Sequence, residues 1–88
     1  MNKEIAVLIS KALSDSTRLE VVELLRDGEM CACRLLSHFS ITQSTLSHHM
    51  KVLCDSTLVK ARKEGKWSHY SIDKEVLKSY LEFLGENL

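Results

Sequence analysis

Apolar residues recur every three or four positions through the first third of the chain, which is the spacing of a helix with one buried face. The pattern predicts one helix across residues 5–13 and a second that begins after Asp15 and ends before Gly28. Asp15 can cap the second helix, and Gly28 suits the left-handed residue that often follows a helix. The apolar positions with helical spacing in the first helix are Ile5, Leu8, Ile9, Ala12 and Leu13, and the expected buried stripe of the second helix is Leu19, Val21, Val22 and Leu25.

Residues 30–53 have the pattern of a helix-turn-helix. The stretch MCACRLLSHF predicts a short helix, and Ser40 and Ile41 are expected to form a tight turn after it. Thr42 can then cap a second helix, TQSTLSHHMKVL, which has one apolar and one polar face. The anchors expected in the two helices are Leu35, Leu36, Phe39, Leu46, Met50 and Leu53.

Residues 58–72 change to the period of two that is typical of a β-strand, with the turn residues EGK in the middle. They predict a β-hairpin with a basic tip. A last helix should follow Asp73, and its wide apolar stripe consists of Val76, Leu77, Tyr80, Leu81 and Leu84. Residues 1–88 therefore predict one domain, mainly α with a small β-hairpin, in the order α-α-α-α-β-β-α of a winged helix-turn-helix.

The small size of the chain favours association with a second copy. A core built from 88 residues buries a modest share of its surface, so we expect a homodimer through the first and last helices. The candidate interface residues are Leu8, Ile9, Leu77, Tyr80 and Leu84. The sequence has no apolar run long enough for a membrane span and no export signal, so a cytoplasmic location is expected, where thiols stay reduced.

Charge is distributed unevenly, although the formal net charge is +0. Residues 1–33 carry −2, residues 34–66 carry +4 and residues 67–88 carry −2. No acidic residue occurs from Arg34 to Cys54. A basic middle segment is typical of contact with nucleic acid, and a solvated helix face is the alternative. No organic cofactor is indicated.

The predicted second helix of the helix-turn-helix and the hairpin tip carry the candidate DNA contacts. Glutamine can pair with adenine, serine and threonine can bond base edges or phosphates, and lysine and arginine suit phosphates. The predicted contacts to double-stranded operator DNA are Gln43, Ser44, Thr45, Ser47, His48, His49, Lys51, Arg62, Lys63 and Lys66.

Three segments, ALSDSTRLEVVELL, TQSTLSHHMKVL and EGKWSHYSI, resemble the ArsR/SmtB family of metal-responsive repressors of bacteria and archaea. The resemblance runs from about Lys11 to Ile72. It implies a homodimer that sits on operator DNA and leaves when an inducer binds, and it implies no enzymatic activity. The CAC sequence falls where members responsive to arsenic, antimony, cadmium or lead keep a Cys-x-Cys pair.

The chain also departs from the family pattern. Leu36 stands where some arsenic-responsive members have a third cysteine, and the last helix has no histidine for a zinc or nickel site. Thr57 stands where many members have a glycine, at the end of the second helix of the helix-turn-helix. Because a β-branched residue disfavours positive φ, we expect this helix to end in another way.

Cys31 and Cys33 are the predicted metal ligands. Thiolates select soft ions, so As(III) or Sb(III), or alternatively Cd(II) or Pb(II), is the expected inducer. The alternatives are two small apolar fillers, a thiol-based sensor of oxidants or persulfide, and, more remotely, a thiol oxidoreductase that uses Cys33 and a histidine.

If the stretch MCACRLLSHF is helical, the thiols of Cys31 and Cys33 point in different directions. Residues two positions apart on a helix point about 200° apart, so one ion would have to unwind the first turn to reach both sulfurs. Cys54 is expected to lie about 20–26 Å away in its own subunit, too far to be a third ligand. The third coordination position of the ion is left to water, a small thiol or a cysteine of the partner chain.

Overall fold

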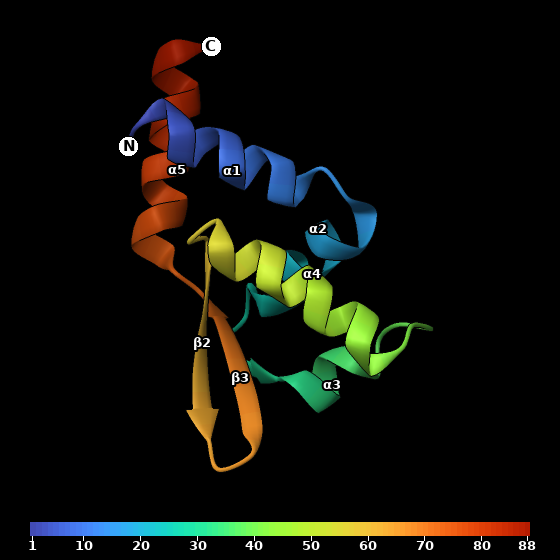
Figure 1. The fold of residues 1–88 in the computed structure, drawn as a ribbon. Coiled ribbons are helices and arrows are strands. Elements are labelled where there is room, and N and C mark those ends of the chain that lie inside the picture. The colour runs from blue at the N-terminus through green and yellow to red at the C-terminus, as the bar shows by residue number, and fades with distance from the viewer.

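The computed structural model describes residues 1–88 as five helices and three strands. Figure 1 shows the first and last helices crossing at one end of the molecule, where both termini lie, and a hairpin that extends from the other end. The elements are α1 (Lys3–Leu13), α2 (Ser16–Leu25), β1 (Met30–Cys31), α3 (Ala32–Leu36), α4 (Gln43–Asp55), β2 (Val59–Glu64), β3 (Trp67–Ile72) and α5 (Lys74–Asn87). No helix has the length and apolar character that a bilayer span requires.

Asparagine, aspartate and threonine side chains cap four of the five helices at their starts. Asp15, Thr42 and Asp73 each accept a hydrogen bond from the backbone N–H three residues ahead, as their place before an apolar stripe predicts. Asn2 does the same for α1. These caps fix where α1, α2, α4 and α5 begin, and the caps predicted at Asp15, Thr42 and Asp73 are confirmed.

The sheet has three strands in the order β1-β3-β2, all antiparallel. The hairpin of β2 and β3 is confirmed, with Val59 opposite Ile72 at its base and Glu64 opposite Trp67 at its tip. The strand β1 was not expected: Met30 pairs with Tyr70 and Cys31 with His69, so residues 30–31 are extended and not helical. A strand of two residues is too short to leave a period in the sequence.

The helix-turn-helix consists of α3 and α4, but α3 has only five residues. The connection runs from Ser37 to Thr42 and is longer than the tight turn at Ser40 and Ile41 that was predicted. The N–H groups of His38 and Phe39 bond the carbonyls three residues earlier, so the chain winds more tightly after Leu36. Phe39 still packs against the core as predicted.

The core is confirmed for the helix-turn-helix, because Leu35, Leu46, Met50 and Leu53 are all buried. In contrast, Leu19 is 47% exposed, contrary to expectation. Apolar residues occur on all sides of α2, so spacing alone could not tell which of them faces inward. The core side of α2 is formed by Val21 and Leu25.

The α1–α5 crossing divides the predicted interface residues into two groups. Ile9 and Tyr80 are buried inside their own chain, and the Tyr80 hydroxyl lies 2.8 Å from the Ser10 hydroxyl, so both belong to the core of the subunit. Leu8 is 44% exposed, and Leu77 and Leu84 are half-buried. Leu81 is 57% exposed and extends the apolar surface of α5.

The end of α4 contradicts the expectation for Thr57, which adopts φ +74°. Its N–H bonds the Cys54 carbonyl at 3.0 Å. The preceding Ser56 is buried, donates from its hydroxyl to the Leu53 carbonyl and accepts from the Leu58 N–H. This sharp stop lets Leu58 enter the core, which offsets the cost of the left-handed threonine.

Replacing Thr57 by glycine should stabilise the protein by about 0.5–1 kcal/mol, because glycine adopts positive φ without a Cβ clash but loses more entropy on folding. Urea unfolding at one fixed protein concentration measures the change. Thr57→Ala is the control and should gain less, since alanine keeps a Cβ. A loss of stability in Thr57→Gly would contradict this account of the left-handed turn.

Candidate nucleic-acid interface and thiol pair

One face of α4 is polar and exposed. Its exposed residues are Gln43, Ser44, Thr45, Ser47, His48 and Lys51. The Lys51 ammonium lies 2.9 Å from the Asp55 carboxylate, which raises the pKa of Lys51. The opposite face of α4 is buried through Leu46, Met50 and Leu53, so the polar face is held outward by the core.

His49 lies apart from that exposed face. Its Nδ1 is 3.1 Å from Arg18 Nη1 and 3.9 Å from the Asp15 carboxylate, and its side chain is 14% exposed. Arg18 also donates from Nε to the Ala12 carbonyl at 2.7 Å. The Arg18 backbone N–H bond to Asp15 lowers the pKa of that carboxyl. His49 therefore fastens α4 to the α1–α2 corner, a role that the sequence did not indicate.

The hairpin tip carries two lysines that have no carboxylate partner. Lys63 and Lys66 are exposed, and Lys66 Nζ lies 5.9 Å from the centre of the Trp67 ring. These positions agree with the predicted basic tip. Both ammonium groups are available to an anionic surface such as a phosphate backbone.

Arg62, the third predicted cation of the hairpin, is exposed but paired with carboxylates of its own chain. Its guanidinium donates to both carboxylate oxygens of Glu29 at 2.7 and 3.1 Å, and to Glu64 at 2.6 Å. These bonds raise the pKa of Arg62 and lower the pKa values of Glu29 and Glu64. Arg62 thus ties the hairpin to the loop before β1.

A row of cross-strand neighbours joins the thiols to the hairpin. Cys31 on β1 is paired with His69 on β3, and His69 is paired with Arg62 on β2. The Glu29 carboxylate lies 4.0 Å from His69 Nδ1 and also bonds Arg62. Cys31, His69, Arg62 and Glu29 thus form a connected row that links β1 to the middle of the hairpin.

Cys31 and Cys33 lie together, with 2.8 Å between their sulfurs. Cys31 is the cap of α3 with extended backbone angles of φ −74° and ψ 156°, and its sulfur accepts from the Arg34 N–H at 3.4 Å. The expectation that the two thiols point to opposite sides is therefore wrong. It assumed that both residues are helical, whereas Cys31 belongs to β1.

The two thiols titrate differently because they share a proton. The hydrogen bond from Cys33, followed by that from the Arg34 N–H, lowers the pKa of Cys31. The same contact raises the pKa of Cys33. Of the two thiols, Cys31 is the one whose ionised form the contacts favour, and a soft ion that binds both sulfurs must displace the remaining proton.

Within the chain, the thiol pair is a two-ligand site. No group of three histidine, cysteine or acidic side chains is arranged to hold a metal ion. Cys54 packs against the core, and burial raises the pKa of its thiol. This agrees with the expectation that Cys54 is not a third ligand from the same subunit.

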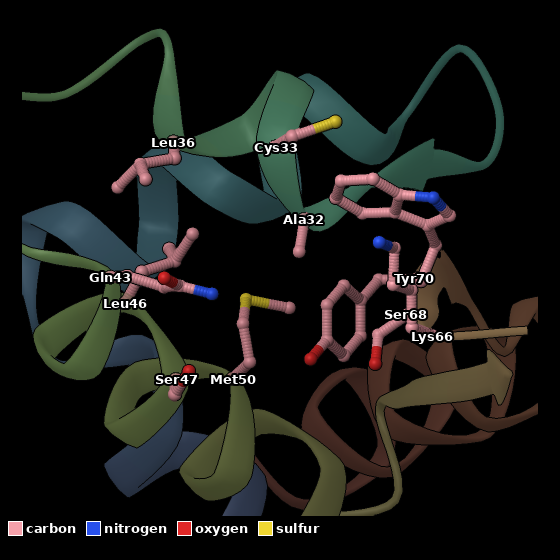
Figure 2. Close-up of a pocket in the computed structure, with 11 residues that line it drawn as sticks. Ala32, Cys33, Leu36, Gln43, Leu46, Ser47, Met50, Lys66, Ser68 and Tyr70 are labelled. Atoms are coloured by element: carbon pink, nitrogen blue, oxygen red, sulfur yellow. The ribbon is translucent and has the colours of Figure 1, made fainter.

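A cavity of about 280 Å³ opens between α3, α4 and the tip of the hairpin, beside Cys33. Figure 2 shows Gln43, Met50 and Tyr70 around its middle and Cys33 at its edge. The cavity depends on how the hairpin folds over the helix-turn-helix, so no sequence signal pointed to it. Its walls join Cys33 to Gln43 and Ser47 on the polar face of α4.

Comparisons with known proteins agree with this geometry. Residues 15–61 match the family described as "Bacterial regulatory protein, arsR family". The chain is 46% identical over 86 residues to an arsenical resistance operon repressor of Staphylococcus xylosus, covering 98% of this chain and 78% of the relative. It is 39% identical over 75 residues to a CadC homolog, a cadmium resistance transcriptional regulatory protein of Staphylococcus aureus, covering 84% of this chain and 62% of the relative. A crystal structure of an ArsR family transcriptional regulator superposes with a TM-score of 0.88 at 27% identity, covering 98% of this chain and 89% of that chain.

The shared proton predicts an order of thiol reactivity. Cys31 should react with iodoacetamide several-fold faster than Cys54 near neutral pH, because the thiolate is the reacting form and the two pKa values are shifted in opposite directions. Peptide mass spectrometry after timed labelling measures both rates. Cys33→Ala removes the hydrogen bond that lowers the Cys31 pKa. In this variant the labelling rate of Cys31 should therefore begin to rise at a higher pH than in the wild type. Equal rates with the same pH dependence for Cys31 and Cys54 would contradict the shared proton.

Proposed function

Because the chain belongs to the ArsR family of bacterial regulatory proteins, we propose that it is a homodimeric repressor that leaves its operator when As(III), or a similar soft ion, binds Cys31 and Cys33. The winged helix-turn-helix makes the chain a DNA-binding transcriptional regulator and not an enzyme. The observation that carries the proposal is the pair of thiols, 2.8 Å apart, at the start of the helix that supports α4.

The chemistry of the pair supports a soft inducer. Two sulfur ligands favour As(III), Sb(III), Cd(II) or Pb(II) over hard cations. The lowered pKa of Cys31 favours the thiolate form that a soft ion binds. Relatives named as arsenical and cadmium resistance regulators agree with an inducer of this class.

The proposed DNA contacts follow from exposure and charge. The polar face of α4, from Gln43 to Lys51, suits base edges and phosphates in the major groove, as a recognition helix does. Lys63 and Lys66 suit phosphates beside it. Arg62 is proposed to act through its bonds to Glu29 and Glu64, which fix the hairpin, and His49 through its contact with Arg18.

The proposed dimer uses the end of the molecule away from the hairpin. Leu8 of α1 and Leu81 of α5 are 44% and 57% exposed, and Leu77 and Leu84 border them. A second copy would cover this apolar surface and add to a small core. The two α4 helices would then read two halves of a pseudo-palindromic operator.

Release would begin with a change in the sulfur separation. Two sulfurs bonded to one soft ion would lie farther apart than two sulfurs that share a proton, because the larger ion would take the place of the proton between them. Opening the pair from 2.8 Å moves Cys31 on β1 relative to Cys33 on α3. Because Cys31 pairs with His69, this motion shifts the hairpin against the helix-turn-helix.

The alternative proposal is a repressor of the same fold whose thiols sense oxidants or persulfide. The close contact between a low-pKa Cys31 and a protonated Cys33 favours attack on an electrophilic sulfur or oxygen species. Such a sensor would release DNA on oxidation, whereas a metal sensor would release it with arsenite under reducing conditions.

Replacing either member of the pair should abolish release by arsenite and leave inducer-free DNA affinity nearly unchanged. Cys31→Ser and Cys33→Ser remove a soft ligand and lie outside the proposed DNA surface. Cys54→Ser is the matched control and should respond like the wild type. Operator binding, followed by fluorescence anisotropy during arsenite titration in a reducing buffer, measures the response. Normal release in Cys33→Ser, or loss of release in Cys54→Ser, would overturn the two-thiol site.

A further inference from the structure

We propose that the cavity beside Cys33 holds a small thiol that carries a carboxylate, and that this thiol supplies the third sulfur to As(III) bound by Cys31 and Cys33. This inference rests on the proposed function and names the ligand set of its site. Cys33 lines one edge of the cavity, whereas Cys31 does not line it. Figure 2 shows the Cys33 sulfur at this edge and directed away from the middle of the space, so the carboxylate end of the thiol, and not its sulfur, would occupy the cavity.

The valence of arsenic requires a third partner. Arsenite, As(OH)₃, has three exchangeable oxygens, and the chain offers two thiols without a third side chain grouped around them. One free thiol and the two cysteines replace all three oxygens. Three As–O bonds break, three As–S bonds form, and three waters leave with the thiol protons. Arsenic stays As(III), so no oxidant or reductant is needed.

The size of the cavity suits a small organic thiol. At about 30 Å³ for each water in the liquid, a volume of 280 Å³ corresponds to about nine waters. Apolar side chains from α3, α4 and β3 form most of its lining, among them Leu36, Met50 and Trp67. The carbon part of the thiol would therefore be covered on several sides.

The charge of the lining selects an anionic group. Lys66 is the one charged residue among those that line the cavity, and no carboxylate is present to balance it. The amide of Gln43 and the hydroxyl groups of Ser47 and Ser68 provide additional hydrogen-bonding partners. A carboxylate on the thiol can therefore bond Lys66 while its sulfur stays on the ion at Cys33.

Occupation of the cavity would also act on DNA binding directly. Gln43, Ser47 and Lys66 line the cavity and belong to the proposed DNA surface. A bound thiol would take up the Lys66 ammonium and hold the Gln43 side chain inward. The ternary complex would then lose DNA contacts in addition to the shift of the hairpin.

Native mass spectrometry of the reduced full chain tests this inference. The protein is mixed with arsenite and with either mercaptoacetate or 2-mercaptoethanol, which differ in the carboxylate. We expect one arsenic and one thiol per chain, with mercaptoacetate preferred about threefold to fivefold, as for an exposed ion pair. Lys66→Gln should lose this preference. Lys63→Gln is the matched control, because Lys63 lies outside the cavity lining, and should keep it.

A second readout is the fluorescence of Trp67, the one tryptophan of the chain, which lines the cavity. Its emission should change when mercaptoacetate is added to the arsenite-bound protein, but not in Cys33→Ser. Arsenic bound without any added thiol, or bridging two chains, would overturn the inference and leave the proposed function standing. Failure to bind arsenic at all would overturn both.

Discussion

The pairing of two residues, Met30 and Cys31, with β3 is the constraint on which the thiol site depends. It makes Cys31 the last residue of a strand and at the same time the cap of α3. The chain turns between Cys31 and Cys33, which brings both sulfurs to the same side. Without this pairing the two residues would continue a helix and their thiols would diverge.

Hydrogen bonds within the chain decide which positive charges remain available. Glu29, just before β1, holds the Arg62 guanidinium with two hydrogen bonds, and Arg18 is held by Ala12 and His49. Lys63 and Lys66 at the tip remain without carboxylate partners. The cations thus divide into Arg18 and Arg62, which position α4 and the hairpin, and Lys63 and Lys66, which are available to an anionic surface. Figure 1 shows that the base of the hairpin lies next to the helices and that its tip extends away from them.

Local signals predicted most of the fold. The caps at Asp15, Thr42 and Asp73, the buried side of α4 and the hairpin depend on residues close in sequence, and all are confirmed. Features that depend on distant partners were not predictable. The direction of Cys31 depends on β3, and the inward place of His49 depends on Arg18. The left-handed Thr57 depends on burial of Leu58, a tertiary gain that overrides a local preference.

The central claim is that the thiol pair is already formed before the inducer binds, so that an ion opens it without unwinding α3. Amide hydrogen exchange, measured with and without one equivalent of arsenite, tests this most directly. The hydrogen-bonded amides at the end of α3, such as Ser37, whose N–H bonds the Cys33 carbonyl, should exchange no faster with arsenite bound. A large loss of their protection would show that α3 unwinds and would contradict a preformed pair.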